Sequence, residues 1–249
     1  MKAFLTALAA GVAIFIAQTA SATQYVWRSA VRTGLFSDYN CWQYKNANNV
    51  YQPADESHHL TEADDFSFWL NPSSGIYYVT NDTSIAFNGG QFSFGRLDFA
   101  DNLSTKSGTD LRIGTSGTAP YLAVVNKHDG NWTIGRDLYI GRVVNNYGVL
   151  TNLSGNITAT SGWIYLGGNV TGGDLPNTTG TLVNVSGTIS AKAMIIGGSA
   201  NNTSGLLEVR GGKVTMTGWE NFGGEWCGVM MASWGGARGE IRVAKAFRC

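Results

Sequence analysis

Hydrophobic and polar residues alternate over short stretches in the C-terminal half of the chain, and each stretch ends at a glycine or another small residue. A short motif, in which two apolar residues flank a third residue of any type, recurs every 26 to 35 residues. The five copies, of which the last is the weakest, are Leu111–Gly114, Leu138–Gly141, Ile164–Gly167, Met194–Gly197 and Val229–Ala232. Alternation with a period of two indicates half-buried strands, and a fixed repeat of this length indicates one small unit stacked on itself.

Each unit contains two further strand-like segments. The second segment follows a turn rich in Gly and Asn, and its alignment slips by one residue between copies, which predicts a β-bulge in some units. Its copies are 148–153, 180–185, 205–209 and 239–243. The third segment is the most regular, with copies at 130–134, 155–159, 187–191 and 212–216.

Alignment of the units places like residues at like positions. Three inward ladders result: Leu138, Ile164 and Met194; Ile140, Leu166 and Ile196; Ile157, Ile189 and Val214. We therefore expect an all-β fold, a parallel β-solenoid with about three short strands per coil, in which neighbouring coils bury one another's inner faces. An antiparallel β-sandwich is the alternative, but it does not require like residues to recur at the same phase.

The N-terminal third does not follow the repeat. Residues 1–22 have the pattern of a secretory signal peptide: Lys2, then an apolar stretch, then the small residues Ala20-Ser21-Ala22 before the expected cleavage site. Residues 23–90 are rich in aromatic side chains and are expected to form an N-terminal cap with the first irregular strands, because the first coil of a solenoid needs its open end covered. The solenoid repeats are expected over 91–249.

The cap also carries a resemblance. Its motif consists of Trp27, Phe36, Asp38, Asn40, Trp42, Pro53, Asp64 and Asp65. In this spacing the motif resembles the start of bacterial secreted β-helix proteins, including autotransporter passenger domains, and the repeats are similar to autotransporter-associated strand repeats. The resemblance implies a bacterial protein that is secreted or displayed on the cell surface. Cys41 departs from the pattern because it separates Asn40 from Trp42.

Composition excludes several classes of function. Lys and Arg together number 17 and so do Asp and Glu, so the net charge is zero, which argues against a nucleic-acid surface. No later apolar run is long enough to span a bilayer in the mature chain. The three histidines and three cysteines lack the spacing of a zinc site, so we expect no metal and no cofactor. Cys227 and Cys249 could pair, which would leave Cys41 free.

A β-helix enzyme is the alternative to a scaffold, and it needs acidic residues that converge. Glycoside hydrolysis uses two carboxylates, which on a solenoid would come from adjacent coils at one phase. The alignment places Trp163, which is not an acid, beside Asp137, so no outward pair of carboxylates is expected. Arg136 and Arg142 flank Asp137 as a solvated ion pair. The pairs His58-His59 and Asp64-Asp65 form the densest polar group; we interpret it as a solvated loop and a turn cap.

Two outward ladders are candidates for binding. Arg112, Tyr139, Tyr165, Ile195 and Met230 share one face, and exposed aromatic rings there could contact an extracellular glycan or a surface protein. The tyrosines could instead stack on each other and cover the flank of the solenoid. The second ladder is Thr133, Thr158, Ser190 and Thr215, since regular threonine arrays can order water.

The sequence as a whole predicts a secreted or cell-surface β-helix scaffold of the adhesin type, without catalytic activity. Its candidate binding residues are Tyr139, Tyr165 and Arg112, and no catalytic residue is assigned. The alternative is a carbohydrate-active β-helix enzyme, a polysaccharide lyase or hydrolase, or a degenerate relative of one.

Overall fold

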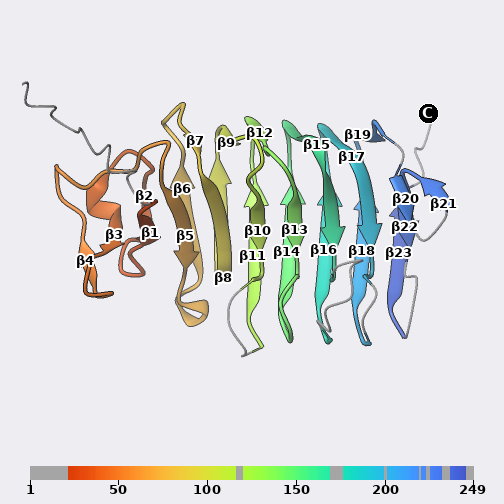
Figure 1. The fold of residues 1–249 in the computed structure, drawn as a ribbon, viewed down its shortest axis with the longest axis horizontal. Helices are drawn as coiled ribbons and strands as arrows, with labels where there is room; N and C mark the ends of the chain where they lie inside the picture. The colour runs from red at the N-terminus through yellow and green to blue at the C-terminus, as the bar shows by residue number, and fades with distance from the viewer. Residues whose placement is uncertain are drawn as a thin grey trace, which may run out of the picture.

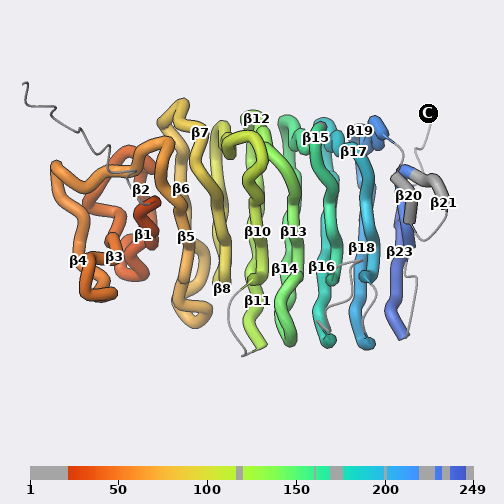
Figure 2. Tube along the Cα trace, in the orientation of Figure 1, coloured from red at the N-terminus to blue at the C-terminus, as the bar shows by residue number. Residues whose placement is uncertain are grey.

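The computed structural model describes residues 22–115, 120–168, 176–198, 201–218, 220–222, 225–231 and 236–244. Over these residues the chain is almost entirely β and winds forward as a parallel β-solenoid (Figure 1). Successive coils lie side by side along the long axis, from the N-terminal end to the C-terminal end, as the tube in Figure 2 shows. The predicted fold class is therefore confirmed, and parallel pairing between coils excludes the antiparallel sandwich.

Three strand faces surround the core. Face 1 consists of β1 (Gln24–Trp27), β5 (Asp65–Trp69), the first half of β8 (Gly89–Ala100), β10 (Leu111–Ile113), β13 (Leu138–Ile140), the ends of β15 (Asn156–Leu166) and β17 (Thr188–Ile196), and β22 (Val229–Met231). Face 2 consists of β2 (Thr33–Leu35), β6 (Ile76–Thr80), the second half of β8, β11 (Leu122–Lys127), β14 (Tyr147–Asn152), β16 (Thr179–Asn184), β18 (Ser204–Val209) and β23 (Arg238–Val243). Face 3 consists of β7 (Ala86–Phe87), β9 (Leu103–Thr105), β12 (Asn131–Thr133), the beginnings of β15 and β17, and β19 (Lys213–Met216).

The inward ladders have the register that the repeat predicts. Leu138 pairs with Ile164, and Ile164 in turn with Met194. The ladders through Leu166 and through Ile189 are likewise continuous. All these side chains except Val214 are fully buried, so each coil contributes its inner face to one shared core.

The predicted slip in the second strand of the unit is wrong. Gly148, Gly180, Gly205 and Gly239 are direct partners, and the strands of face 2 pair without a register shift. The irregularity lies elsewhere, in the long strands β15 and β17 where they turn from face 3 to face 1. Glycine is needed at Gly180 because a Cβ there would lie 2.1 Å from the backbone oxygen of Ile140.

Residues 23–90 contain antiparallel cap strands together with the first parallel coils. β3 (Trp42–Lys45) pairs antiparallel with β1 and with β4 (Tyr51–Pro53), after the short 3-10 helix η1 (Tyr39–Cys41). β5 and β6 already pair in parallel with β8 and are separated by a second 3-10 helix, η2 (Pro72–Ser74). Aromatic rings fill this end of the core; Phe36 alone contacts the rings of Trp42, Phe66, Phe68, Phe87 and Phe99.

On face 2, the last inward position of three successive strands carries a buried polar side chain. Lys127, Asn152 and Asn184 follow one another in neighbouring coils and are fully buried. Each donates hydrogen bonds to a carbonyl three residues ahead and to a carbonyl in the turn of the next coil. Lys127 therefore does with its ammonium group what the two asparagines do with their amides.

The C-terminal end carries a small antiparallel hairpin of β20 (Glu220–Phe222) and β21 (Glu225–Cys227). Within the described ranges, no helix has the length and apolar character needed to cross a membrane. The expected signal peptide, apart from Ala22, and the suggested pairing of Cys227 with Cys249 fall outside the residues whose placement or side chains are described.

Candidate functional site on face 1

Face 1 presents two outward rows of side chains along the solenoid. The first row is Asp65, Gly89, Asp110, Asp137, Trp163 and Ala193. The second row is Ser67, Gln91, Arg112, Tyr139, Tyr165, Ile195 and Met230. Neighbouring members of a row are about 4.8 Å apart because they stand on adjacent strands. The predicted outward ladder from Arg112 to Met230 is confirmed as the second row.

Two acids and two arginines lie together on face 1, and we call them the acid–arginine cluster: Asp110, Arg112, Arg136 and Asp137. Arg136 donates to both oxygens of Asp110, at 2.7 and 2.9 Å, and Arg112 donates to the same carboxylate at 3.0 Å. Asp137, on the next coil, accepts the backbone N–H of Trp163 at 2.8 Å and lies 3.7 Å from Nε of Arg136. The cluster thus pairs its charges internally.

The protonation behaviour of the cluster follows from this pairing. Burial alone would raise the pKa of Asp110, but the hydrogen bonds from Arg136 and Arg112 outweigh burial and hold that pKa below its usual value. The bond to Asp110 likewise raises the pKa of Arg136. A general acid needs a carboxyl whose pKa is raised toward neutral pH, and Asp110 is shifted the other way.

The two candidate tyrosines stack against each other. The rings of Tyr139 and Tyr165 are 4.6 Å apart at 15°, and their residues are only 6% and 7% exposed. The guanidinium of Arg142 covers the Tyr139 ring at 3.9 Å. Of the two interpretations of this ladder, mutual stacking therefore describes the rings, and exposed rings do not. Binding by Tyr139, Tyr165 and Arg112 stays a prediction.

Burial changes the acidity of this stack. It raises the pKa of Tyr139 to about 12, with a further contribution from the charge of Asp137, to which the Tyr139 hydroxyl donates at 3.1 Å. Burial also raises the pKa of Tyr165, followed by the effect of Tyr139. Both shifts favour the neutral phenol over the phenolate.

The first row is interrupted at Gly89, and a hollow opens there. Its volume is about 260 Å³. The lining includes Gln24, Asp65, Ser67, Asn88, Gly89, Gln91, Thr109, Asp110 and Arg112. We call this hollow the Gly89 notch. It borders the acid–arginine cluster, because Asp110 and Arg112 belong to both.

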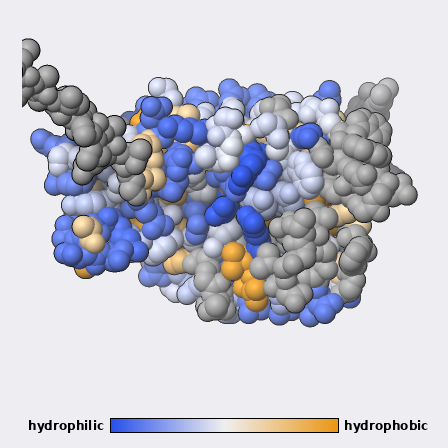
Figure 3. Space-filling view, in the orientation of Figure 1, coloured by the Kyte–Doolittle hydropathy of each residue, from blue (hydrophilic) through white to orange (hydrophobic). Residues whose placement is uncertain are grey.

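The visible side of the molecule in Figure 3 mixes polar and apolar residues. In Figure 3 strongly hydrophilic residues gather midway along the visible side of the molecule, beside a small hydrophobic group. Outside the core, Tyr139, Tyr165, Ala193 and Ile195 form a second buried hydrophobic cluster, against which Trp163 and Met230 pack.

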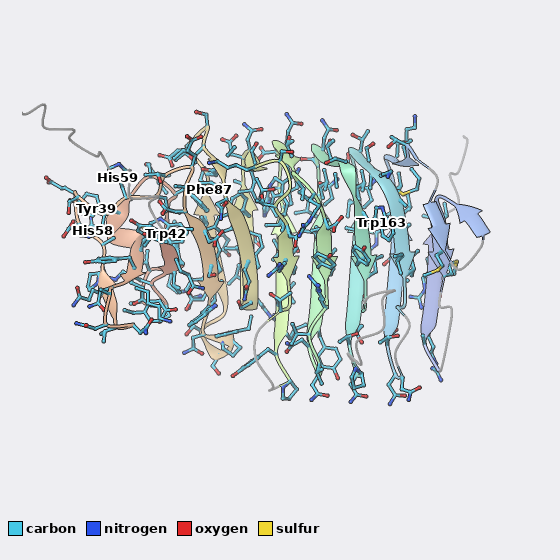
Figure 4. The ribbon with its side chains drawn as sticks, in the orientation of Figure 1. Tyr39, Trp42, His58, His59, Phe87 and Trp163 are labelled. Carbon is cyan, nitrogen blue, oxygen red and sulfur yellow. The ribbon has the colours of Figure 1, made fainter. Side chains whose placement is uncertain are left out.

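The polar residues of the cap are not brought together as one site. His58 stacks on Tyr44 at 4.0 Å and its Nδ1 lies 2.8 Å from Oδ1 of Asp55. Asp64 accepts hydrogen bonds from the backbone and hydroxyl of Thr61, as expected of a turn cap. In Figure 4 His58 and His59 lie at the N-terminal end, several coils from Trp163.

A separate apolar hollow of about 400 Å³ lies beside the cap, where Tyr39, His59, Leu60 and Ile85 are among its lining residues. Among the described residues, no group of three or more His, Cys, Asp or Glu side chains is arranged to hold a metal ion. The threonine ladder of face 3 has the predicted register, with Thr133, Thr158, Ser190 and Thr215 as successive partners.

The expectation of no outward carboxylate pair is wrong for Asp110 and Asp137, and the Gly89 notch was not expected either. The partnership of Asp110 and Asp137 had a signal, because each aspartate directly precedes a copy of the same repeated strand. The notch had none, since Asp65 and Gly89 belong to the part of the chain that does not follow the repeat.

Comparison of the chain with models of protein families, with curated proteins and with solved structures gives no match. The autotransporter resemblance thus remains an expectation from the cap motif and the repeats.

Proposed function

We propose that the protein is a secreted or cell-surface scaffold of the adhesin type, which holds a binding surface on a rigid solenoid and catalyses no reaction. The observation that carries the proposal is the closed pairing of the acid–arginine cluster. Asp110 is the most buried acid of that cluster, its side chain is 3% exposed, and both of its oxygens are engaged by arginine.

Acids are also paired with arginines on face 2. Glu208 pairs with Arg210, and Glu240 pairs with Arg242 one coil further on. These acids and bases are partners of each other on the same strand, and the hydrogen bonds from the arginines lower the pKa of both glutamates. Side chains arranged in this way suit a stable surface that presents its shape, because they are already satisfied before any ligand arrives.

A carbohydrate-active enzyme is the second candidate, and one observation favours it. Asp110 and Asp137 stand at the same phase on adjacent coils with Arg136 beside them, which is the type of convergence that such an enzyme would need. The scaffold is preferred because catalysis by this pair would first require its ion pairs to open.

Two assays on the purified protein separate these candidates. The first measures retention of the protein on beads coated with a panel of neutral and acidic polysaccharides and on intact cells. The second measures release of reducing ends and of unsaturated uronate products from the same polysaccharides. We expect retention without product release, and we expect the isosteric variant Asp137→Asn to be retained like the unmodified protein. Product release that Asp137→Asn abolishes would replace the scaffold with the enzyme.

A further inference from the structure

The Gly89 notch is a break in an otherwise continuous row of side chains. Asp65 and Asp110 stand on the strands to either side of Gly89, so their Cα atoms are roughly 9.6 Å apart, twice the strand spacing. Gly89 has no side chain, so the backbone of face 1 forms the base of the hollow between the carboxylates of Asp65 and Asp110. The hollow of about 260 Å³ is slightly below the roughly 300 to 1,000 Å³ of pockets for drug-sized ligands, so it has room for a single small ring.

The groups around the notch are donors and acceptors of hydrogen bonds. The side chains of Gln24, Asn88 and Gln91 are amides, each with two donor hydrogens and an acceptor oxygen. Ser67 is only 2% exposed, and its hydroxyl oxygen accepts a long hydrogen bond from the side chain of Gln24, at 3.5 Å. This lining suits a ligand with several hydroxyl groups in fixed directions.

The charges of the notch select among such ligands. Asp110 is neutralised by Arg112 and Arg136. Asp65 has no ion-pair partner among the residues that the structure describes; its Oδ1 accepts one hydrogen bond, from Asn88 at 3.1 Å. A free carboxylate accepts strong hydrogen bonds from neutral hydroxyl groups and repels a second carboxylate. The notch is therefore unfavourable for a uronic acid.

We propose that the Gly89 notch is a binding subsite for one neutral hexose or N-acetylhexosamine residue of an extracellular glycan. Asp65 accepts hydrogen bonds from the hydroxyl groups of the ring, and the amides of Gln24 and Gln91 orient it. This inference rests on the proposed function, since it names the ligand of the scaffold and the place where the ligand binds.

The structure offers two variants of different kinds for the test. Asp65→Asn keeps the shape of the notch and removes its free charge. Gly89→Leu fills the notch; a Cβ at this position would lie 2.8 Å from Oδ1 of Asp65, a side-chain atom that can rotate away, and its next contacts are at 3.8 Å. Asp129→Asn, which removes an exposed carboxylate in the turn before face 3, is the matched control.

The experiment measures binding of five methyl glycosides by saturation-transfer NMR with the full chain. The probes are the glycosides of glucose, galactose, mannose, N-acetylglucosamine and glucuronic acid. We expect at least one neutral glycoside to bind with a millimolar dissociation constant and the glucuronide to bind at least tenfold more weakly. Asp65→Asn and Gly89→Leu should each weaken neutral binding at least tenfold, and Asp129→Asn should not change it.

Three results would overturn the subsite: no neutral glycoside binds, the glucuronide binds as tightly as the neutral sugars, or Asp65→Asn binds like the unmodified protein. Because Asp65→Asn is isosteric, its result is decisive even where Gly89→Leu lowers the thermal stability. Retention of both variants on glycan beads at the unmodified level would reject the notch and leave the scaffold in place. Cleavage of a glycan by the unmodified protein would reject the scaffold itself.

Discussion

Lys127 gives the sharpest test of the interior of the solenoid. Its side chain is fully buried, and burial lowers its pKa from 10.5 to about 8. The unfolded chain therefore binds the proton more tightly than the folded chain does. The buried charge costs stability at and below pH 8, and that cost disappears as the pH rises toward 10.5. Lys127 thus makes the protein more stable as the pH rises.

The size of the effect follows from the shift. A difference of about 2.5 pH units corresponds to about 3 kcal/mol in the free energy of unfolding, and roughly 1 kcal/mol of this is recovered between pH 7 and pH 9. Other groups act in the opposite direction: the raised pKa of Cys41, about 11, means that stability is lost as the pH rises above 9. The contribution of Lys127 must therefore be read as a difference between two proteins.

The comparison protein is Lys127→Asn, which extends the row of Asn152 and Asn184 by one coil. An amide at this position can donate to the carbonyls that the ammonium now contacts, those of Gly130 and Ser154, as the two asparagines do in their own coils. Urea denaturation of both proteins at pH 7, 8 and 9 measures the difference. Between pH 7 and pH 9 we expect the free energy of unfolding of the unmodified protein to rise by about 1 kcal/mol relative to that of the variant. An equal pH dependence of the two proteins would refute the buried, shifted lysine.

Three further predictions concern stability and reactivity. Leu166→Ala empties a fully buried position of an inward ladder and should lower the free energy of unfolding by about 2 to 5 kcal/mol in urea; a loss below roughly 0.5 kcal/mol would contradict the stacked core. Gly180→Ala places a methyl group 2.1 Å from a backbone oxygen of the preceding coil and should lower the melting temperature far more than Gly89→Ala, which meets a movable side chain; equal losses would count against the register of face 2. Burial, with the charge of Asp38, raises the pKa of Cys41 to about 11, so at pH 8 this thiol should react with a thiol reagent much more slowly in the folded protein than in the unfolded protein. Equal rates would contradict its burial. The variant Cys41→Ser identifies the part of the signal that comes from Cys41.

The repeat was sufficient to predict the fold because each ladder depends on one kind of side chain. Ile140, Leu166 and Ile196 recur at the same phase, and only a forward-winding chain places them over one another. The slip expected on face 2 was wrong because the glycines, rather than the aliphatic residues, set that register. Glycine is required there by the close approach of backbone from adjacent strands, which alternation of hydrophobic residues does not reveal.

The site was less accessible to sequence reasoning. Its charged cluster joins Asp137 to Asp110 on the preceding coil, whereas the expectation from the repeat concerned the next coil, where Trp163 is the neighbour. The exposure of Tyr139 and Tyr165 could not be read from their outward phase, because a stack of rings buries itself and Arg142 covers it. An outward position in a ladder predicts direction, and packing along the ladder decides exposure.

Both proposals depend on the forward winding of the chain, and a cysteine cross-link between coils tests it most directly. Thr158 and Ser190 are partners on adjacent coils of face 3, whereas Thr133 and Ser190 are two coils apart. Adjacent partners, at about 4.8 Å, lie within the Cα range of a disulfide, and a separation of roughly 9.6 Å lies outside it. Under mild oxidation, Thr158→Cys with Ser190→Cys should form an intramolecular disulfide, and Thr133→Cys with Ser190→Cys should not, with the native cysteines as a constant background in both. Efficient cross-linking of the second pair, or failure of the first, would contradict the solenoid and with it the scaffold that the proposals place on its surface.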